Sequence, residues 1–121
     1  MNTPRLNLLV LRSNQRAPLR AFYEALGCVF VQEQHGNGPV HFSCETDGVV
    51  FELYPSSSNQ TPTTADVRLG FSVDDLDALM QSLGDADVPV VAAPKRSPWG
   101  YRAVVEDPDG RRVELLEPAD S

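Results

Sequence analysis

Long apolar runs, cysteines and basic stretches are all scarce in this chain of 121 residues. No run of about eighteen apolar residues is available to cross a membrane, and residues 1–5 lack the basic-then-apolar build of a signal peptide. The two cysteines, Cys28 and Cys44, are too few for a disulfide framework and lack the C-x-x-C spacing of metal sites. We therefore expect a cytoplasmic protein, with no membrane contact, whose thiols are reduced and lie in the core.

A net charge of -7 is spread along the chain and leaves no basic stripe. Such a surface repels a phosphate backbone, so nucleic acid is not an expected partner. The chain is 41% apolar, and at this length one compact domain with one core is the default expectation.

Two segments share one helical pattern, with apolar residues at positions i, i+3, i+4 and i+7. These residues are Leu19, Phe22, Tyr23 and Leu26 in the first segment and Leu76, Leu79, Met80 and Leu83 in the second, 57 residues later. Pro18 suits the first turn of the first helix and Gly27 its end, while Asp74 or Asp75 caps the second and Gly84 closes it. The pattern predicts two amphipathic helices that are counterparts.

Strand-like runs surround each helix in the same order, one before it and three after it. The runs are Leu6–Leu11, Cys28–Val31, Val40–Cys44 and Val49–Tyr54 in the first half, and Leu69–Val73, Val88–Ala92, Tyr101–Glu106 and Arg111–Leu116 in the second. Asp47-Gly48 and Asp109-Gly110 are typical of the tight turns that join antiparallel strands. Each half therefore ends in a predicted hairpin.

The repeat predicts an α+β fold of two tandem βαβββ modules within one domain, residues 1–121. The modules span about 5–55 and 67–118, and the Ser-, Thr- and Pro-rich residues from about 56 to 66 form a linker. A mostly antiparallel four-stranded sheet with one helix behind it has one face free for a partner or ligand. Two such sheets side by side would form a cup.

Alternation along the hairpins predicts which side chains face that cup. A two-residue turn at Asp47-Gly48 directs apolar side chains toward the helix: Phe42, Cys44, Phe51 and Leu53. It directs polar ones to the other face: His41, Ser43, Glu45, Glu52 and Tyr54. In the last hairpin Val113 and Leu115 face the helix, opposite Arg112, Glu114 and Leu116. Glu52 and Glu114 thus become repeat-related carboxylates, which either line a site or simply solvate an open sheet.

Two motifs resemble the vicinal oxygen chelate superfamily, which includes glyoxalase I, bleomycin-resistance proteins and extradiol dioxygenases. Phe22-Tyr23 followed by Leu26-Gly27 resembles the superfamily's helix ending, and Glu106-Asp107-Pro108-Asp109-Gly110 with Val113-Glu114-Leu115 resembles its closing hairpin. The resemblance extends along nearly the whole chain. It implies four metal-ligand positions, one on the first and one on the last strand of each half: Leu8, Glu52, Arg68 and Glu114.

Only two of these four positions carry a possible ligand. Glu52 and Glu114 are oxygen donors, but Leu8 has no donor atom and Arg68 is a permanent cation. We therefore expect no metal cofactor, and hypothesise that Arg68 takes the place of the ion and pairs with Glu52, Glu114 or both. Alternatively, His41 joins the two glutamates as the ligands of a divalent metal ion, or it only forms hydrogen bonds.

The segment Lys95–Gly100 contains the single tryptophan of the chain, Trp99, between proline and glycine. Its indole either closes over a bound molecule, or caps the edge of the core or a dimer contact. The glycine-rich segment His35–Pro39 has no following helix and no Lys-Ser/Thr pair, so it is interpreted as a strand connector rather than a phosphate-binding loop.

The sequence is consistent with three functions. The first is a metal-free module that binds a small organic molecule in the cup, as bleomycin-resistance proteins do, through Arg68, Glu52, Glu114, His41, Ser43, Tyr54 and Trp99. The second is a divalent-metal-dependent lyase, isomerase or dioxygenase of the glyoxalase I type that uses Glu52 and Glu114. The third is a metal-free acid-base enzyme that uses His41 and Glu52. A homodimer is expected because relatives commonly pair and open sheets leave strand edges to cover.

Overall fold

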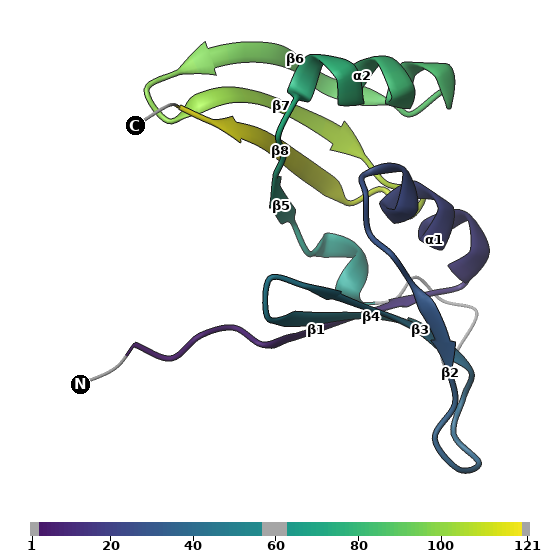
Figure 1. Ribbon diagram of the computed structural model, residues 1–121. Helices are drawn as coiled ribbons and strands as arrows, with labels where there is room; N and C mark the ends of the chain where they lie inside the picture. Colours follow the sequence, from purple (N-terminus) through teal and green to yellow (C-terminus); the bar gives the residue numbers. More distant parts are fainter. Residues whose placement is uncertain (1–2, 57–62, 120–121) are drawn as a thin grey trace. The chain divides into compact units, whose positions relative to one another are not determined.

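A computed structural model describes residues 3–56 and 63–119 (Figure 1). The chain divides into two compact units, Met1–Ala65 and Asp66–Ser121. The first contains β1 (Leu8–Ser13), α1 (Arg16–Ala25), β2 (Val31–Glu33), β3 (His41–Thr46), β4 (Val49–Pro55) and most of a short 3-10 helix, η1 (Thr63–Asp66). The second contains β5 (Leu69–Ser72), α2 (Leu76–Asp85), β6 (Val90–Ser97), β7 (Gly100–Glu106) and β8 (Arg112–Pro118). Neither α-helix in the described part of the chain is long and apolar enough to cross a membrane.

Each unit forms its own four-stranded sheet, in the order β1-β4-β3-β2 in the first unit and β5-β8-β7-β6 in the second. The pairs β1–β4 and β5–β8 are parallel, and the remaining neighbours are antiparallel. The first strand of each unit therefore lies beside its last. This confirms the predicted α+β fold of two βαβββ modules with mostly antiparallel pairing.

The first hairpin has the predicted turn. Thr46 pairs with Val49, and the two residues between them have positive φ, 48° at Asp47 and 84° at Gly48. A turn with two positive φ values matches the twist of the flanking strands, which favours Asp-Gly at this place. The resulting register pairs Ser43 with Glu52, as predicted.

The helix-facing side of each sheet forms the core of its unit. In the first unit α1 buries Leu19, Phe22 and Tyr23, and the Tyr23 ring meets Phe51 of β4 edge-on at 5.0 Å. Edge-to-face contacts of this kind stabilise a core beyond the area they bury. In the second unit the buried residues include Leu76, Leu83, Val113 and Leu115.

The helix ends agree with the predictions in three of four places. Pro18 lies in the first turn of α1, as predicted. Gly27 follows the end of α1 at a φ of 114°, and Asp75 caps α2 by accepting a hydrogen bond from the backbone N–H of Ala78 at 3.1 Å. Gly84, however, does not close α2. The helix continues to Asp85, and Asp87 takes the left-handed conformation instead, with a φ of 58°. Aspartate adopts this conformation more readily than most side chains do.

The strand that follows each helix begins later than predicted. β2 starts at Val31 rather than at Cys28, and β6 covers Val90–Ser97 rather than Val88–Ala92. After each helix the chain needs several residues to turn back onto the sheet, and apolar content alone does not separate those residues from a strand.

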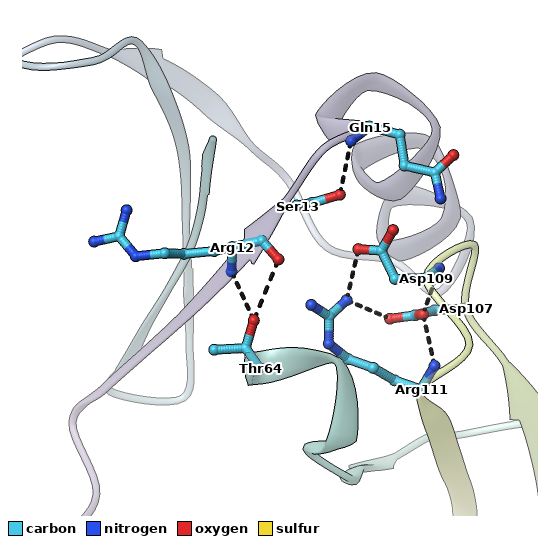
Figure 2. Close-up of polar contacts among 7 residues, drawn as sticks. All are labelled: Arg12, Ser13, Gln15, Thr64, Asp107, Asp109 and Arg111. Atoms are coloured by element: carbon cyan, nitrogen blue, oxygen red, sulfur yellow. Dashed lines mark hydrogen bonds and ion pairs between the residues drawn. The ribbon is translucent and has the colours of Figure 1, made fainter. Parts of the chain in front are cut away.

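The second hairpin has a longer connection than a two-residue turn. Glu106 pairs with Arg112, so residues 107–111 lie between the strands. Arg111 is buried there, and its guanidinium lies 3.1 Å from Asp107 Oδ2 and 3.0 Å from Asp109 Oδ2 (Figure 2). The backbone N–H groups of Asp109 and Arg111 both donate to Asp107 Oδ1. These bonds hold the wider loop closed.

Part of the predicted linker, residues 57–62, lies outside the described residues. The rest of it includes η1, where the Thr64 hydroxyl lies against β1 (Figure 2). Thr64 Oγ1 accepts a hydrogen bond from the Arg12 backbone N–H at 3.1 Å and donates one to the Arg12 carbonyl at 3.2 Å. These two bonds fix the segment to the edge of the first sheet.

Candidate functional site

The buried imidazole of His41 is the centre of the polar face of the first sheet. His41 begins β3, is only 1% exposed, and stacks on the Tyr54 ring of β4 with centroids 4.1 Å apart and an interplanar angle of 9°. Its Nδ1 lies 3.2 Å from the Pro39 carbonyl oxygen. Because a carbonyl only accepts, Nδ1 carries the hydrogen, and Nε2 is left to face the other side chains of the site.

Two carboxylates from neighbouring strands approach that nitrogen. Glu33 of β2 places Oε1 3.3 Å from His41 Nε2, and Glu52 of β4 places Oε2 3.4 Å from it. A second imidazole is close by, since His35 Nε2 lies 3.8 Å from the same Glu33 oxygen. The first sheet thus brings His41 and Glu52 together, as alternation predicted, and adds Glu33 and His35, which sequence reasoning missed.

Glu33 and His35 could not be predicted as site residues, because their position depends on the pairing of β2 with β3, which the sequence does not reveal. Glu33 pairs with His41 across β2 and β3, and His35 returns toward them from the connecting loop. The expected strand ended at Val31, which left both residues in a connector. The available signal was the spacing Glu-x-His-x5-His in the sequence.

The remaining predicted residues of the first unit extend the same face. Ser43 pairs with Val31 on one side and Glu52 on the other. Arg12 of β1 pairs with Tyr54, and its guanidinium carbon lies 5.3 Å from the centre of the Tyr54 ring. The Tyr54 ring therefore stacks on the His41 imidazole and also attracts the Arg12 guanidinium, since the face of an aromatic ring is electrostatically negative.

An ion pair joins two strands on the polar face of the second unit. Arg102 of β7 donates through Nε to Glu114 Oε1 of β8. Gly70 pairs with Glu114 from β5, and a Cβ there would lie 3.7 Å from Glu114 Oε2. The first strand therefore places no side chain beside the carboxylate.

Arg68 does not form the ion pair that was expected of it in this unit. It is exposed, and within the described residues of the second unit Glu114 pairs with Arg102 instead. A two-residue turn at Asp109-Gly110 would pair Val105 with Glu114 and direct Arg102 toward the helix. The actual register pairs Val104 with Glu114, a slip of one residue that moves Arg102 to the polar face.

Trp99 lies in the turn between β6 and β7 and is 75% exposed. Its backbone N–H donates to Ser97 Oγ at 3.2 Å, so the turn is ordered by its own polar groups. The indole does not cap the core edge, which was one of the alternatives considered for it.

The Cys28 thiol does not supply a nucleophile. Burial, together with the neighbouring Cys44 thiol, raises the pKa of Cys28 to about 12. A thiol with such a pKa stays protonated near neutral pH and is a poor nucleophile.

Comparisons with known proteins agree with the fold. TnmS3, an antibiotic binding protein from Streptomyces sp. CB03234, is 26% identical with a TM-score of 0.75, and the likeness covers 98% of this chain and 99% of that one. The oxidase ChaP-H2 is 22% identical with a TM-score of 0.74, covering 98% and 96%. Lactoylglutathione lyase from Agrobacterium tumefaciens is 19% identical with a TM-score of 0.70, covering 97% and 96%.

No curated protein matches the chain. A family model does match it, over residues 5–115, which include every strand and helix from β1 to most of β8. The match therefore spans both βαβββ modules together with the segment between them. The chain belongs to the Glyoxalase/Bleomycin resistance protein/Dioxygenase superfamily.

Proposed function

We propose that this protein binds a small organic molecule and does so without a metal ion at the superfamily's four ligand positions. The observation that carries the proposal is the donor set at those positions. Glu52 and Glu114 offer carboxylate oxygens, but Leu8 is aliphatic and Arg68 is cationic. A divalent ion needs three or four donors, and an arginine beside it adds repulsion.

The same donor set argues against a metal-dependent lyase, isomerase or dioxygenase of the glyoxalase I type. Such an enzyme requires the ion to hold and polarise its substrate. Two of the four positions do not fit the ion, so Glu52 and Glu114 alone do not supply the donors that such a reaction needs.

The residues available for an organic ligand combine aromatic surface with fixed polar groups. Trp99 presents an exposed indole, and Tyr54 presents a ring already held by its stack on His41. Ser43 and Glu52 add donors and acceptors in the first unit, as Glu114 and Arg68 do in the second, and such groups would orient a bound molecule. Binding sites for small molecules typically have this composition, with apolar contact for affinity and a few polar groups for orientation.

The likeness to TnmS3 supports the proposal, because that protein binds an antibiotic and matches this chain over nearly the full length of both. The expected ligand class is therefore a polar aromatic compound of antibiotic size. An excess of acidic side chains favours a cationic or neutral compound over an anionic one.

A thermal-shift screen tests the proposal. Antibiotics and small oxygenated aromatic compounds are screened in EDTA, since a ligand that binds only the folded state raises the melting temperature. We expect at least one saturable shift that EDTA leaves unchanged, and a weaker affinity in Trp99→Ala. Val29→Ala is the matched control, because Val29 is 76% exposed and Trp99 75%. Shifts that appear only with added metal would contradict the proposal.

We also propose that the protein is a cytoplasmic homodimer. Support comes from the exposed apolar residues of the edge strands, Val31 on β2 and Val90 and Val91 on β6, because a second copy would cover them. Light scattering at micromolar concentration should give twice the chain mass of 13.3 kDa, and a monomer mass would contradict the dimer.

A further inference from the structure

We infer that Glu33, His35 and His41, with Glu52 as a fourth ligand, form a binding site for a divalent transition metal ion of the zinc type. This site lies within the first unit, and Glu52 is the only residue it shares with the superfamily's ligand positions. The inference does not depend on the proposed function, since it concerns a metal alone.

Two of the distances between donor atoms match tetrahedral coordination. With bonds of about 2.0–2.1 Å, the ligand atoms around zinc lie about 3.3–3.4 Å from one another. Here Glu33 Oε1 lies 3.3 Å from His41 Nε2, and Glu52 Oε2 lies 3.4 Å from the same nitrogen. His35 Nε2 lies 3.8 Å from Glu33 Oε1, and the donor atoms of Glu33, His35 and His41 are all within 4.8 Å of one another.

The tautomer of His41 is the one a metal ligand requires. Nδ1 donates to the Pro39 carbonyl, so the lone pair of a neutral ring is on Nε2. Metal-binding histidines usually donate their second N–H to such an acceptor, which fixes the tautomer and the orientation of the ring. Burial and the stack on Tyr54 further hold His41 in place.

Charge also favours a cation at this point. Two carboxylate oxygens lie 3.3 and 3.4 Å from one buried imidazole nitrogen, and without a positive charge beside them each repels the lone pair of that nitrogen. A divalent ion would neutralise the two carboxylates. Imidazole and carboxylate together are donors that suit zinc, nickel and copper better than magnesium or calcium.

The second unit supplies an internal contrast. Its registers place Lys95, Arg102 and Glu114 where the first unit has Glu33, His41 and Glu52. Arg102 already neutralises Glu114, and neither cation can ligate. The geometry of the sheet is therefore shared by the two units, whereas the donor set is present only in the first among the described residues.

The test is a titration of metal-free protein, prepared with EDTA and then freed of it, against Zn²⁺ by calorimetry and against Co²⁺ by visible absorption. We expect one equivalent of each ion per chain, with the strong absorption bands of tetrahedral Co²⁺. His35→Ala and Glu33→Gln should each weaken affinity at least about tenfold, since loss of even an outer-shell partner costs about 10–100-fold. Glu45→Gln is the control, because Glu45 is an exposed carboxylate of the same sheet, and it should bind as the original protein does.

His35 is exposed, so its alanine variant should fold, and circular dichroism checks this. The inference is overturned if no saturable binding of one equivalent occurs, or if His35→Ala and Glu33→Gln bind as tightly as Glu45→Gln. It is also overturned if nitrogen-15 NMR finds His41 protonated at both ring nitrogens before and after Zn²⁺ is added, because a proton would then occupy the place of the ion.

Discussion

Arg102 occupies in the second unit the place that His41 occupies in the first. In the first unit Ser43 pairs with Glu52, and His41 lies two residues before Ser43. In the second unit Val104 pairs with Glu114, and Arg102 lies two residues before Val104. In both units the side chain contacts that glutamate diagonally across the hairpin. One sheet geometry thus supports an imidazole–carboxylate contact in the first unit and a guanidinium–carboxylate ion pair in the second.

Removing the stack on His41 should destabilise the first unit. Tyr54→Leu loses an aromatic pair, which contributes about 0.5–1.5 kcal/mol beyond buried area, whereas Tyr54→Phe keeps the ring and should lose much less. Urea unfolding of the three proteins measures the difference. Equal destabilisation by both variants would mean that the hydroxyl, and not the stack, matters.

Arg111 should be among the most sensitive charged positions in the chain. Arg111→Met leaves the buried Asp107 carboxylate without its cation, and breaking a buried pair in this way costs about 3–5 kcal/mol of unfolding free energy. Arg112→Met is the control, since Arg112 is the exposed neighbour and should change stability by less than about 0.5 kcal/mol. Similar midpoints in urea for both variants would contradict this account of the loop.

Glycine substitutions should have opposite effects at two positions. At Gly100 the φ is 143° and a Cβ would lie 2.3 Å from the Glu117 carbonyl oxygen, so Gly100→Ala should lower the melting temperature markedly. Gly84 is helical with open space around it, so Gly84→Ala should stabilise by about 0.4–1 kcal/mol. A neutral Gly100→Ala would refute the close approach of β7 to the chain end of β8.

Cys28 should be unreactive in the folded protein. With its pKa raised to about 12, only about one thiol in 10,000 is ionised at pH 8, so iodoacetamide should modify it far more slowly than in the urea-unfolded chain. The unfolded thiol ionises first as pH rises, so the free energy of unfolding should fall between pH 9.0 and about 12. Cys28→Ala should reduce that fall. Equal alkylation rates in the folded and unfolded protein would contradict the burial of this thiol.

The sequence determined more of the fold than of the site, for reasons that particular residues make clear. Helical spacing and the Asp47-Gly48 turn are local signals, and they predicted both helices and the register that places Glu52 beside Ser43. Arg111 was not recognised as the buried cation of the second loop, because its contacts depend on how the whole turn folds back. The longer loop shifts the β7–β8 register by one residue, and a two-residue turn therefore does not predict that Arg102 lies beside Glu114.

The cluster around His41 illustrates a second limit. Alternation placed His41 and Glu52 on one face, but Glu33 and His35 join them only because β2 pairs with β3. A short strand that begins after a loop has a weak pattern, so its pairing could not be predicted from composition. The expectation that no metal binds considers the superfamily's four positions and His41, but not Glu33 and His35, and it stays a prediction.

In each unit the first strand pairs in parallel with the last, β1 with β4 and β5 with β8. Every ladder of hydrogen bonds is completed by strands of one half, so a substitution on the polar side of one sheet leaves the backbone pairing of the other intact. Each half can therefore carry its own chemistry on a common scaffold. The first carries imidazoles among acids, and the second a guanidinium that neutralises Glu114.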